Sequence, residues 1–238
     1  MDRRAWDGQF EAFSRDYKVI RYDVRGIGES ARPDGPFSHS RDLFELFKFL
    51  NIDRAHIAGL SVGGAIAIDF AIEHPEKVDG LILAASGVSD DSKAEANVHG
   101  LMTLSTMTKA EGIEHVIKLV LDTPFVVSPG NELARERIRQ IYLDNRDVFE
   151  SGFPIYLQWE AIQPAASQRL GNIRARTLVI RGDSDSPAYS MLVDKIASGI
   201  RGSSKAVIPG GTHFLNLEKP NEFNHAVGEF LTDVGAAS

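Results

Sequence analysis

The stretch Gly59-Leu60-Ser61-Val62-Gly63 lies where an apolar segment gives way to a helical pattern. Residues His56–Leu60 are typical of a short buried strand, and Gly64–His74 predicts a helix. A serine at such a strand-to-helix turn is held in a strained backbone conformation, with its hydroxyl exposed and the next N–H facing the same space. Gly59 and Gly63 are expected where the strand and the helix approach closely. A Gly-rich turn with a solvated serine is the alternative interpretation.

Two further segments supply the partners that a serine nucleophile needs. In Thr177–Pro187 a short apolar strand ends at a glycine, and two acids, Asp183 and Asp185, precede the proline. In Ala206–Phe214 another short strand ends in a Gly-rich loop that carries His213. The chain order is therefore Ser, Asp, His, which is one of the three orders known for unrelated catalytic triads.

With these motifs, the chain resembles the α/β-hydrolase superfamily, and within it the small capped esterases, lactonases and C–C hydrolases. Asp23–Ser30 looks like the turn after the family's fourth strand, Gly59–Gly63 like its nucleophile elbow, and Gly182–Pro187 like its acid loop. Gly210–His213, followed by Glu218-Lys219-Pro220, looks like the histidine loop and the start of the last helix. The resemblance covers nearly the whole chain.

Strands alternate with helices, which predicts an α/β fold with a mainly parallel sheet and helices on both faces. In such sheets chemistry lies beyond the carboxyl ends of the strands, and Ser61, Asp185 and His213 all follow such ends. Further expected strands are Tyr17–Val24, Val78–Ala85 and Lys205–Ile208. The expected helices contain Trp6–Phe13, Leu43–Leu50, Met191–Ile200 and Phe223–Leu231. Ser40 is the expected N-cap of the helix that contains Leu43–Leu50, and Pro220 lies near the first turn of the last helix.

Residues 88–170 break this alternation, because they show helical spacing and no strong strand pattern. Helical segments are expected around 113–120, 133–142 and 153–162. We predict a helical cap over residues 88–170, inserted in a core of residues 1–87 and 171–238 and lying over Ser61. Its apolar side chains are candidates for the substrate pocket, and the alternative for each is simple packing within the cap: Met102, Tyr156 and Trp159 above all, with Met107, Phe125 and Phe149.

The choice of acid leaves three candidates. The family pattern places the functional acid just before the proline-containing turn, which favours Asp185. Asp183 is expected to hydrogen-bond the backbone of the turn instead. An acid after the preceding strand, such as Asp90, is the third alternative, and geometry decides among them.

The resemblance implies a mechanism and leaves the substrate open. His213 would act as general base for Ser61, Asp185 would orient the imidazole, and the Val62 N–H would supply one oxyanion donor. The expected substrate is a small carboxylic ester or lactone with an apolar part. One alternative is a C–C hydrolase acting on diketones, and another is a ligand-binding sensor that keeps the triad. A serine at this position argues against dehalogenase and epoxide hydrolase chemistry.

Composition excludes several other classes. The 238 residues can bury one substantial core, and a net charge of −7 without a basic cluster argues against nucleic-acid binding. The chain has no cysteine, and its histidines lack the spacing of metal ligands, so we expect no metal and no cofactor. Ile57–Ile72 is interrupted by Asp69, and Met1–Trp6 has no apolar leader pattern, which predicts a cytoplasmic protein without membrane partners. An oligomer stays open.

The resemblance also predicts a missing segment. Family members carry two or three strands before the point where this chain begins, and the third ends in a His-Gly loop that gives the second oxyanion donor. Met1–Trp6 resembles the segment just after that loop. The chain is therefore expected to be N-terminally truncated, with weakened activity. Tyr17–Val24 would then either pair with His56–Leu60 or leave a gap in the sheet.

Overall fold

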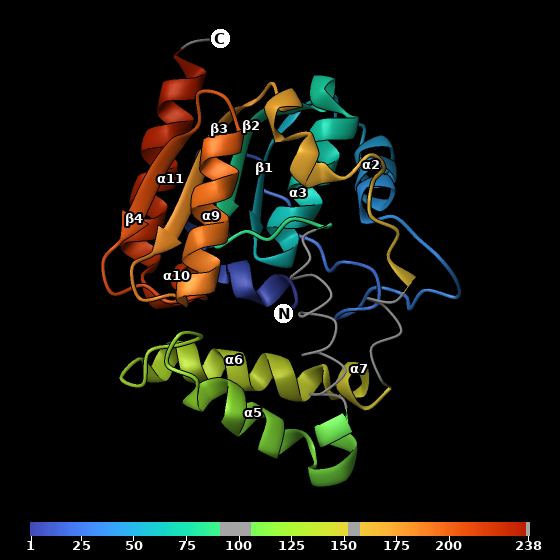
Figure 1. The fold of residues 1–238 in the computed structure, drawn as a ribbon, viewed down its shortest axis with the longest axis vertical. Helices are drawn as coiled ribbons and strands as arrows, with labels where there is room; N and C mark the ends of the chain where they lie inside the picture. The colour runs from blue at the N-terminus through green and yellow to red at the C-terminus, as the bar shows by residue number, and fades with distance from the viewer. Residues whose placement is uncertain (91–105, 152–157, 237–238) are drawn as a thin grey trace.

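A computed structural model describes residues 1–90, 106–151 and 158–236 (Figure 1). In these residues β1 (Ala55–Leu60), β2 (Val78–Ala84), β3 (Arg176–Gly182) and β4 (Ser204–Ile208) form one sheet in the order β1-β2-β3-β4. Each neighbouring pair is parallel. The predicted α/β fold with a parallel sheet is confirmed, and all four carboxyl ends lie at one edge of the sheet.

Helices cover both faces because side chains of the buried strands alternate between two apolar clusters. Leu81 and Leu83 of β2 belong to the cluster that contains α2 (His39–Phe49), α3 (Val62–Glu73) and α9 (Pro187–Gly199). Ile82 and Ala84 belong to the opposite cluster. That second cluster is built on the helices at the two ends of the chain, α1 (Asp7–Phe13), α10 (Leu215–Glu218) and α11 (Pro220–Gly235). Four short 3-10 helices occur in the described residues: Arg3–Trp6, Pro75–Lys77, Ala166–Gln168 and Leu170–Asn172.

The predicted strand at Tyr17–Val24 is wrong. These residues form no strand, and β1 is an edge strand of the sheet in the part of the chain that the structure describes. The segment is held by side chains instead of a strand ladder. The carboxylate of Asp23 accepts hydrogen bonds from the backbone N–H groups of Arg3 (2.6 Å) and Glu29 (3.0 Å), and it also pairs with the Arg3 guanidinium. Tyr17 and Ile20 remain about 40% exposed (42% and 41%), so the segment buries too little apolar surface to act as a core strand.

The N-cap predicted at Ser40 is also wrong, because α2 begins earlier. The Ser38 hydroxyl accepts the hydrogen bond from Arg41 N at 3.3 Å and caps the helix, while Ser40 is buried in its first turn. Just before the cap, the Phe37 backbone pairs with a distant segment. Phe37 N donates to Gln158 O at 2.9 Å, and Glu160 N donates to Phe37 O at 2.8 Å. This pairing fixes where the chain enters α2.

The described residues 106–151 are mainly helical: a helical stretch at 106–111 is followed by α5 (Ile113–Asp122), α6 (Glu132–Asp144) and α7 (Arg146–Glu150). In Figure 1, α5 and α6 lie beyond the carboxyl ends of the strands. Apolar residues of both helices share a cluster with Leu60 at the end of β1 and with Phe214. The first half of the helix expected around 153–162 lies outside the described residues. The prediction is wrong for 159–162, which are not helical, because Trp159 forms a β-bridge with Phe37 instead. The division into a core and an inserted cap stays a prediction. No helix in the described part is long and apolar enough to span a membrane.

Candidate active site

Ser61 lies between the last residue of β1 and the first residue of α3, and its backbone is strained. Its φ of 54° and ψ of −115° are values that residues other than glycine rarely adopt. Four backbone hydrogen bonds hold this conformation. Ser61 N donates to Ala84 O at 2.9 Å, and Ser61 O accepts from Gly64 N at 3.0 Å, from Ala65 N at 3.2 Å and from Gly87 N at 3.1 Å. The turn is therefore fixed by the ends of β1, β2 and α3 together.

Two glycines allow β1, α3 and the end of β2 to approach at this turn. A Cβ at Gly59 would lie well under 3.0 Å from the Gly63 carbonyl, and one at Gly64 would collide with the Ser86 side chain. A Cβ at Gly63 would meet nothing within 4 Å. The expectation of a close approach is therefore confirmed for Gly59 and wrong for Gly63. Gly64 is the second glycine that the packing requires.

His213 and Asp185 form a pair between the loops that follow β4 and β3. His213 Nδ1 lies 3.2 Å from Asp185 Oδ2, and the other carboxylate oxygen, Oδ1, accepts from Ser186 N at 2.6 Å. Asp185 is only 7% exposed, so its charge acts on the imidazole with little screening by water. The Tyr189 ring packs on the imidazole with 4.4 Å between ring centroids. Because Nδ1 faces the carboxylate, Nε2 is the nitrogen left to face a substrate.

The other two acid candidates bind elsewhere. Asp183 Oδ1 accepts from Gly210 N at 2.7 Å, so it binds backbone as expected, but in the loop that carries His213 instead of in its own turn. Asp90 accepts from the Ser167 backbone N–H at 2.9 Å and from the Ser167 hydroxyl at 2.7 Å. Among the three candidates, Asp185 is therefore the one whose carboxylate contacts His213.

Ser61 and His213 are brought to the same region through their neighbours in the chain. Leu60, just before Ser61, and Phe214, just after His213, belong to one apolar cluster. The Ser61 hydroxyl makes no hydrogen bond to His213 or to another residue of the described chain, so its approach to the imidazole stays a prediction. Val62 is the first residue of α3, where a backbone N–H has no carbonyl of its own helix to bind and can point at an anion.

The predicted pocket residues have different outcomes. Met102 and Tyr156 lie outside the described residues. Trp159 packs against His39, with 5.1 Å between ring centroids, and its buried indole N–H has no hydrogen-bond partner in the described chain. Phe149 is buried and stacks on Tyr142, as the packing alternative proposed. Phe125 is 46% exposed and its carbonyl accepts from His213 N at 2.9 Å, and Met107 is half-buried.

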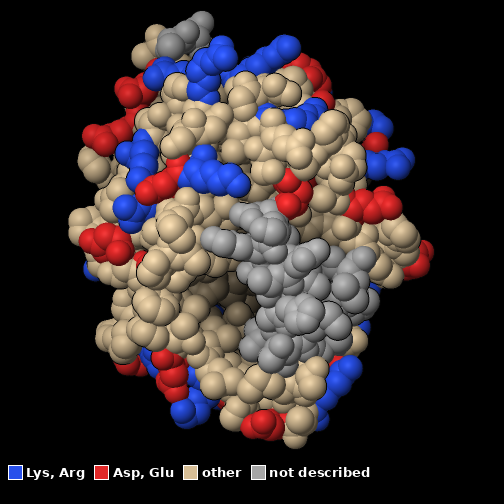
Figure 2. All heavy atoms as spheres, in the orientation of Figure 1, with Lys and Arg blue, Asp and Glu red and all other residues tan. Residues whose placement is uncertain are grey.

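Figure 2 shows a hollow between the part of the molecule that holds the sheet and the part that holds α5 and α6. The hollow lies at the level of the strand ends, and the described residues on its left and lower border are other than Lys, Arg, Asp and Glu. On the same face, basic and acidic side chains are interspersed rather than gathered by sign. A recess at this edge is where the chemistry of a parallel sheet is expected.

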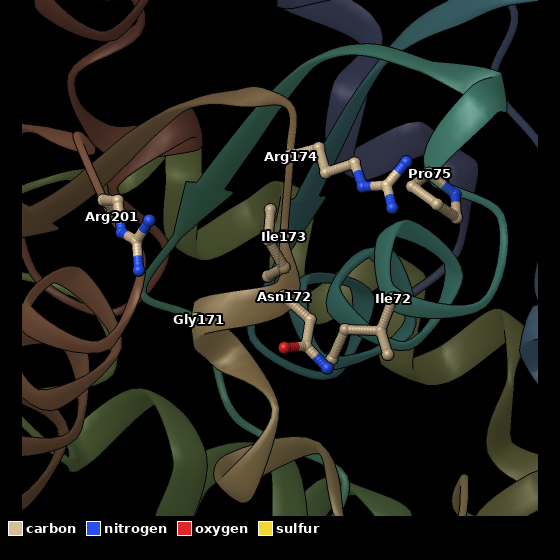
Figure 3. Close-up of a pocket in the computed structure, with 7 residues that line it drawn as sticks. All are labelled: Ile72, Pro75, Gly171, Asn172, Ile173, Arg174 and Arg201. Atoms are coloured by element: carbon tan, nitrogen blue, oxygen red, sulfur yellow. The ribbon is translucent and has the colours of Figure 1, made fainter.

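A separate cavity of about 590 Å³ lies at the opposite edge of the sheet (Figure 3). Its lining comes from segments that precede strands: Pro75 precedes β2, Ile173 and Arg174 precede β3, and Arg201 precedes β4. In Figure 3 the two arginines flank Ile173. Because Ser61 and His213 follow the other ends of the strands, we do not assign this cavity to their chemistry. No cluster of three or more potential metal ligands occurs in the described residues.

Sequence reasoning missed a buried carboxylate beside the histidine loop. Glu218 is 7% exposed and binds the backbone N–H of Thr212 at 3.1 Å, next to His213. The sequence offers one signal, an acid directly before Lys219-Pro220 at the start of the last helix.

Comparisons with known proteins show the family to which this fold belongs. A family model described as alpha/beta hydrolase fold matches residues 2–220. The 2-hydroxy-6-oxo-6-phenylhexa-2,4-dienoate hydrolase of Comamonas testosteroni is 29% identical, with 90% of this chain and 77% of the relative covered. A thermophilic esterase from Thermogutta terrifontis superposes with a TM-score of 0.80 at 25% identity, covering 98% of this chain and 86% of the esterase. The enol-lactonase from Burkholderia xenovorans LB400 superposes with a TM-score of 0.73 at 27% identity, covering 97% of this chain and 87% of the lactonase. With a family match over nearly its whole length, the chain belongs to the alpha/beta hydrolase fold family and is an enzyme of the hydrolase class.

Proposed function

We propose that this hydrolase cleaves small carboxylic esters or lactones through an acyl-enzyme formed on Ser61. The observation that carries the proposal is the contact of 3.2 Å between His213 Nδ1 and Asp185 Oδ2, at the same sheet edge as the strained turn of Ser61. The similarity to an esterase and to an enol-lactonase supports this choice of substrate class.

The proposed chemistry assigns one step to each side chain. His213 Nε2 takes the proton of the Ser61 hydroxyl as the serine oxygen attacks the acyl carbonyl. Asp185 holds the Nδ1–H tautomer and stabilises the imidazolium that results. The imidazolium then protonates the leaving alcohol, and a water molecule that His213 activates releases the acid. Each step uses the same imidazole, so the position of His213 controls the rates of both the formation and the hydrolysis of the acyl-enzyme.

The Val62 N–H supplies one oxyanion donor in this mechanism. It belongs to the first turn of α3, so the partial positive charge of the helix N-terminus adds to its effect. Loss of one such donor lowers kcat by roughly 10²–10³-fold in other serine hydrolases.

A C–C hydrolase acting on diketones is the second candidate. One observation favours it, the 29% identity to the dienoate hydrolase of Comamonas testosteroni. A panel of p-nitrophenyl esters, aliphatic lactones and a vinylogous diketone separates the two candidates by kcat/KM. Preference for the diketone would overturn the ester and lactone proposal.

Labelling with a fluorophosphonate probe, followed by mapping of the modified peptide, tests the nucleophile. We expect the label on Ser61, and loss of both labelling and turnover in Ser61→Ala. Ser184→Ala is the matched control, because Ser184 is an exposed serine of the acid loop whose hydroxyl binds Asp183 Oδ1 at 2.9 Å. Labelling of another serine in the wild type, or turnover in Ser61→Ala, would contradict the proposal.

A further inference from the structure

Glu218 binds two loops that meet at His213. It is the last residue of α10 and is 7% exposed. One carboxylate oxygen, Oε1, accepts from Ser128 N at 2.6 Å, in the loop between α5 and α6. The other, Oε2, accepts from Thr212 N at 3.1 Å and contacts the Thr212 hydroxyl. The backbone carbonyl of Glu218 accepts from the Asn131 side chain at 3.0 Å. A single buried residue therefore joins the α5–α6 loop to the histidine loop.

The same two loops are also hydrogen-bonded directly, on both sides of His213. His213 N donates to Phe125 O at 2.9 Å, and Phe214 N donates to Val126 O at 3.3 Å. The Thr212 hydroxyl lies 2.9 Å from Val126 O, so it shares its one hydrogen between that carbonyl and Glu218. The backbone of His213 is thus held against residues that follow α5, and Glu218 supports that contact through its hydrogen bonds with Thr212.

This arrangement suits a positioning role. Hydrogen bonds from backbone N–H groups to a carboxylate are among the strong ones, and buried networks of this kind fix a single geometry. A catalytic imidazole needs such a support, because a displacement of about 1 Å can cost roughly 10²-fold in rate. Asp185 contacts the ring of His213, whereas the Glu218 network holds its backbone.

We propose that Glu218 is a positioning residue that, through Thr212 and the α5–α6 loop, sets the distance between His213 and Asp185. The inference rests on the proposed role of His213 as general base. It makes the α5–α6 loop a working part of the hydrolytic site, because that loop supplies the Ser128 donor and the Phe125 and Val126 acceptors.

Substitutions at Thr212 and Glu218 test the proposal. Thr212→Val removes the hydroxyl at nearly constant volume, and Thr212→Ser keeps it. Glu218→Gln replaces one acceptor oxygen by a donor that faces an N–H. Thr177→Val is the matched control. Thr177 is a buried threonine whose hydroxyl donates to Ala175 O at 3.0 Å. It lies near the first residue of β3, at the other end of the strands from the loop that carries His213.

The readouts are kcat and KM, the pH profile of kcat/KM, and the fraction of active sites titrated by a fluorophosphonate. For Thr212→Val and Glu218→Gln we expect kcat per titrated site to fall about tenfold or more with little change in KM. We also expect the pH profile of kcat/KM to differ from that of the wild type, because the imidazole of His213 has moved from the carboxylate that stabilises its protonated form during turnover. Thr212→Ser should restore both, and Thr177→Val should leave both unchanged.

A purely structural role would lower the titrated fraction in proportion to activity and leave the pH profile in place, and that result would overturn the proposal. Wild-type kcat and pH profile in Thr212→Val would overturn it too, even if Glu218→Gln fails to fold. Ser61→Ala in the same assay distinguishes failure of the positioning role from failure of the proposed function. If Ser61→Ala is inactive and Thr212→Val is normal, only the positioning role fails, whereas turnover in Ser61→Ala removes the proposed function and this inference together.

Discussion

Gly182, the last residue of β3, lies directly against the backbone of Gly211 in the loop that carries His213. A Cβ at Gly182 would come well under 3.0 Å from the Gly211 carbonyl oxygen. That same oxygen accepts from Ser184 N at 3.0 Å, so the acid loop and the histidine loop touch through it. The approach of Asp185 to His213 depends on this contact between two glycines.

Gly182→Ala should therefore both destabilise the protein and lower its activity. The colliding atom belongs to the backbone, so the loops must separate to relieve the contact, at a cost of about 1–3 kcal/mol or more in the free energy of unfolding. The control is Gly228→Ala in the middle of α11, where a Cβ meets nothing within 4 Å. This control should gain roughly 0.5–1 kcal/mol, because glycine is a poor residue for a helix interior. Urea unfolding and kcat/KM measure both variants, and equal stabilities would contradict the argument.

The two acids of the loop after β3 give a second prediction. Asp185→Asn should lower kcat on the order of 10⁴-fold, because an amide facing Nδ1 favours the wrong imidazole tautomer. Asp183→Asn should lower it less than tenfold, because its Oδ1 can still accept from Gly210 N. Steady-state kinetics on one ester substrate compare the two variants. A larger loss at Asp183 than at Asp185 would mean that the wrong acid has been assigned.

Local patterns were sufficient to predict the elbow, whereas the choice of Asp185 as the acid also needed the family pattern. Ser61 lies on a turn whose strand and helix are neighbours in the sequence, so a short window contains the evidence. The role of Gly64 was not visible in that way. Its missing Cβ makes room for Ser86, which reaches the turn only when β2 is placed beside β1.

Elements that depend on distant partners were mispredicted or missed. Tyr17–Val24 carries the alternation of a strand, but a strand also needs a neighbour, and Asp23 instead binds the backbone of Arg3. The support of His213 was missed because Glu218 and Ser128 are 90 residues apart in the chain. An acid just before a proline looks like an ordinary helix start, and only the fold shows that it is buried between two loops.

Two buried titratable groups give opposite pH dependences of stability. Burial raises the pKa of Asp69 to about 7 from 3.8, despite a hydrogen bond of 2.7 Å from the Ser89 hydroxyl, and Glu73 and Asp90 add to the rise. Burial lowers the pKa of His39 to about 4 from 6.5, with Arg25 adding to the fall and Asp42 opposing it. Between pH 3.8 and about 7, Asp69 is protonated in the native state and ionised in the unfolded chain. Between about pH 4 and 6.5, His39 is neutral in the native state and protonated in the unfolded chain.

The signs follow from proton linkage. Between about pH 4 and 6.5 the Asp69 contribution to the free energy of unfolding decreases as the pH rises, and the His39 contribution increases, each by up to about 1.4 kcal/mol per pH unit. The two slopes oppose each other in the wild type. Asp69→Asn should therefore become more stable relative to the wild type as the pH rises from 4 to 7. His39→Gln should become less stable relative to the wild type as the pH rises from 4 to 6.5.

Urea unfolding at half-unit steps of pH measures these differences directly. The double variant is the control, because it lacks both groups and its stability should follow the wild-type pH dependence over the window in which the two slopes cancel. The comparison uses differences between variants at each pH, so the titration of exposed carboxylates, which is common to all four proteins, drops out. A stability difference between Asp69→Asn and the wild type that stays flat from pH 4 to 7 would show that native Asp69 is ionised throughout, and that its burial in α3 is offset by contacts stronger than the single Ser89 hydroxyl.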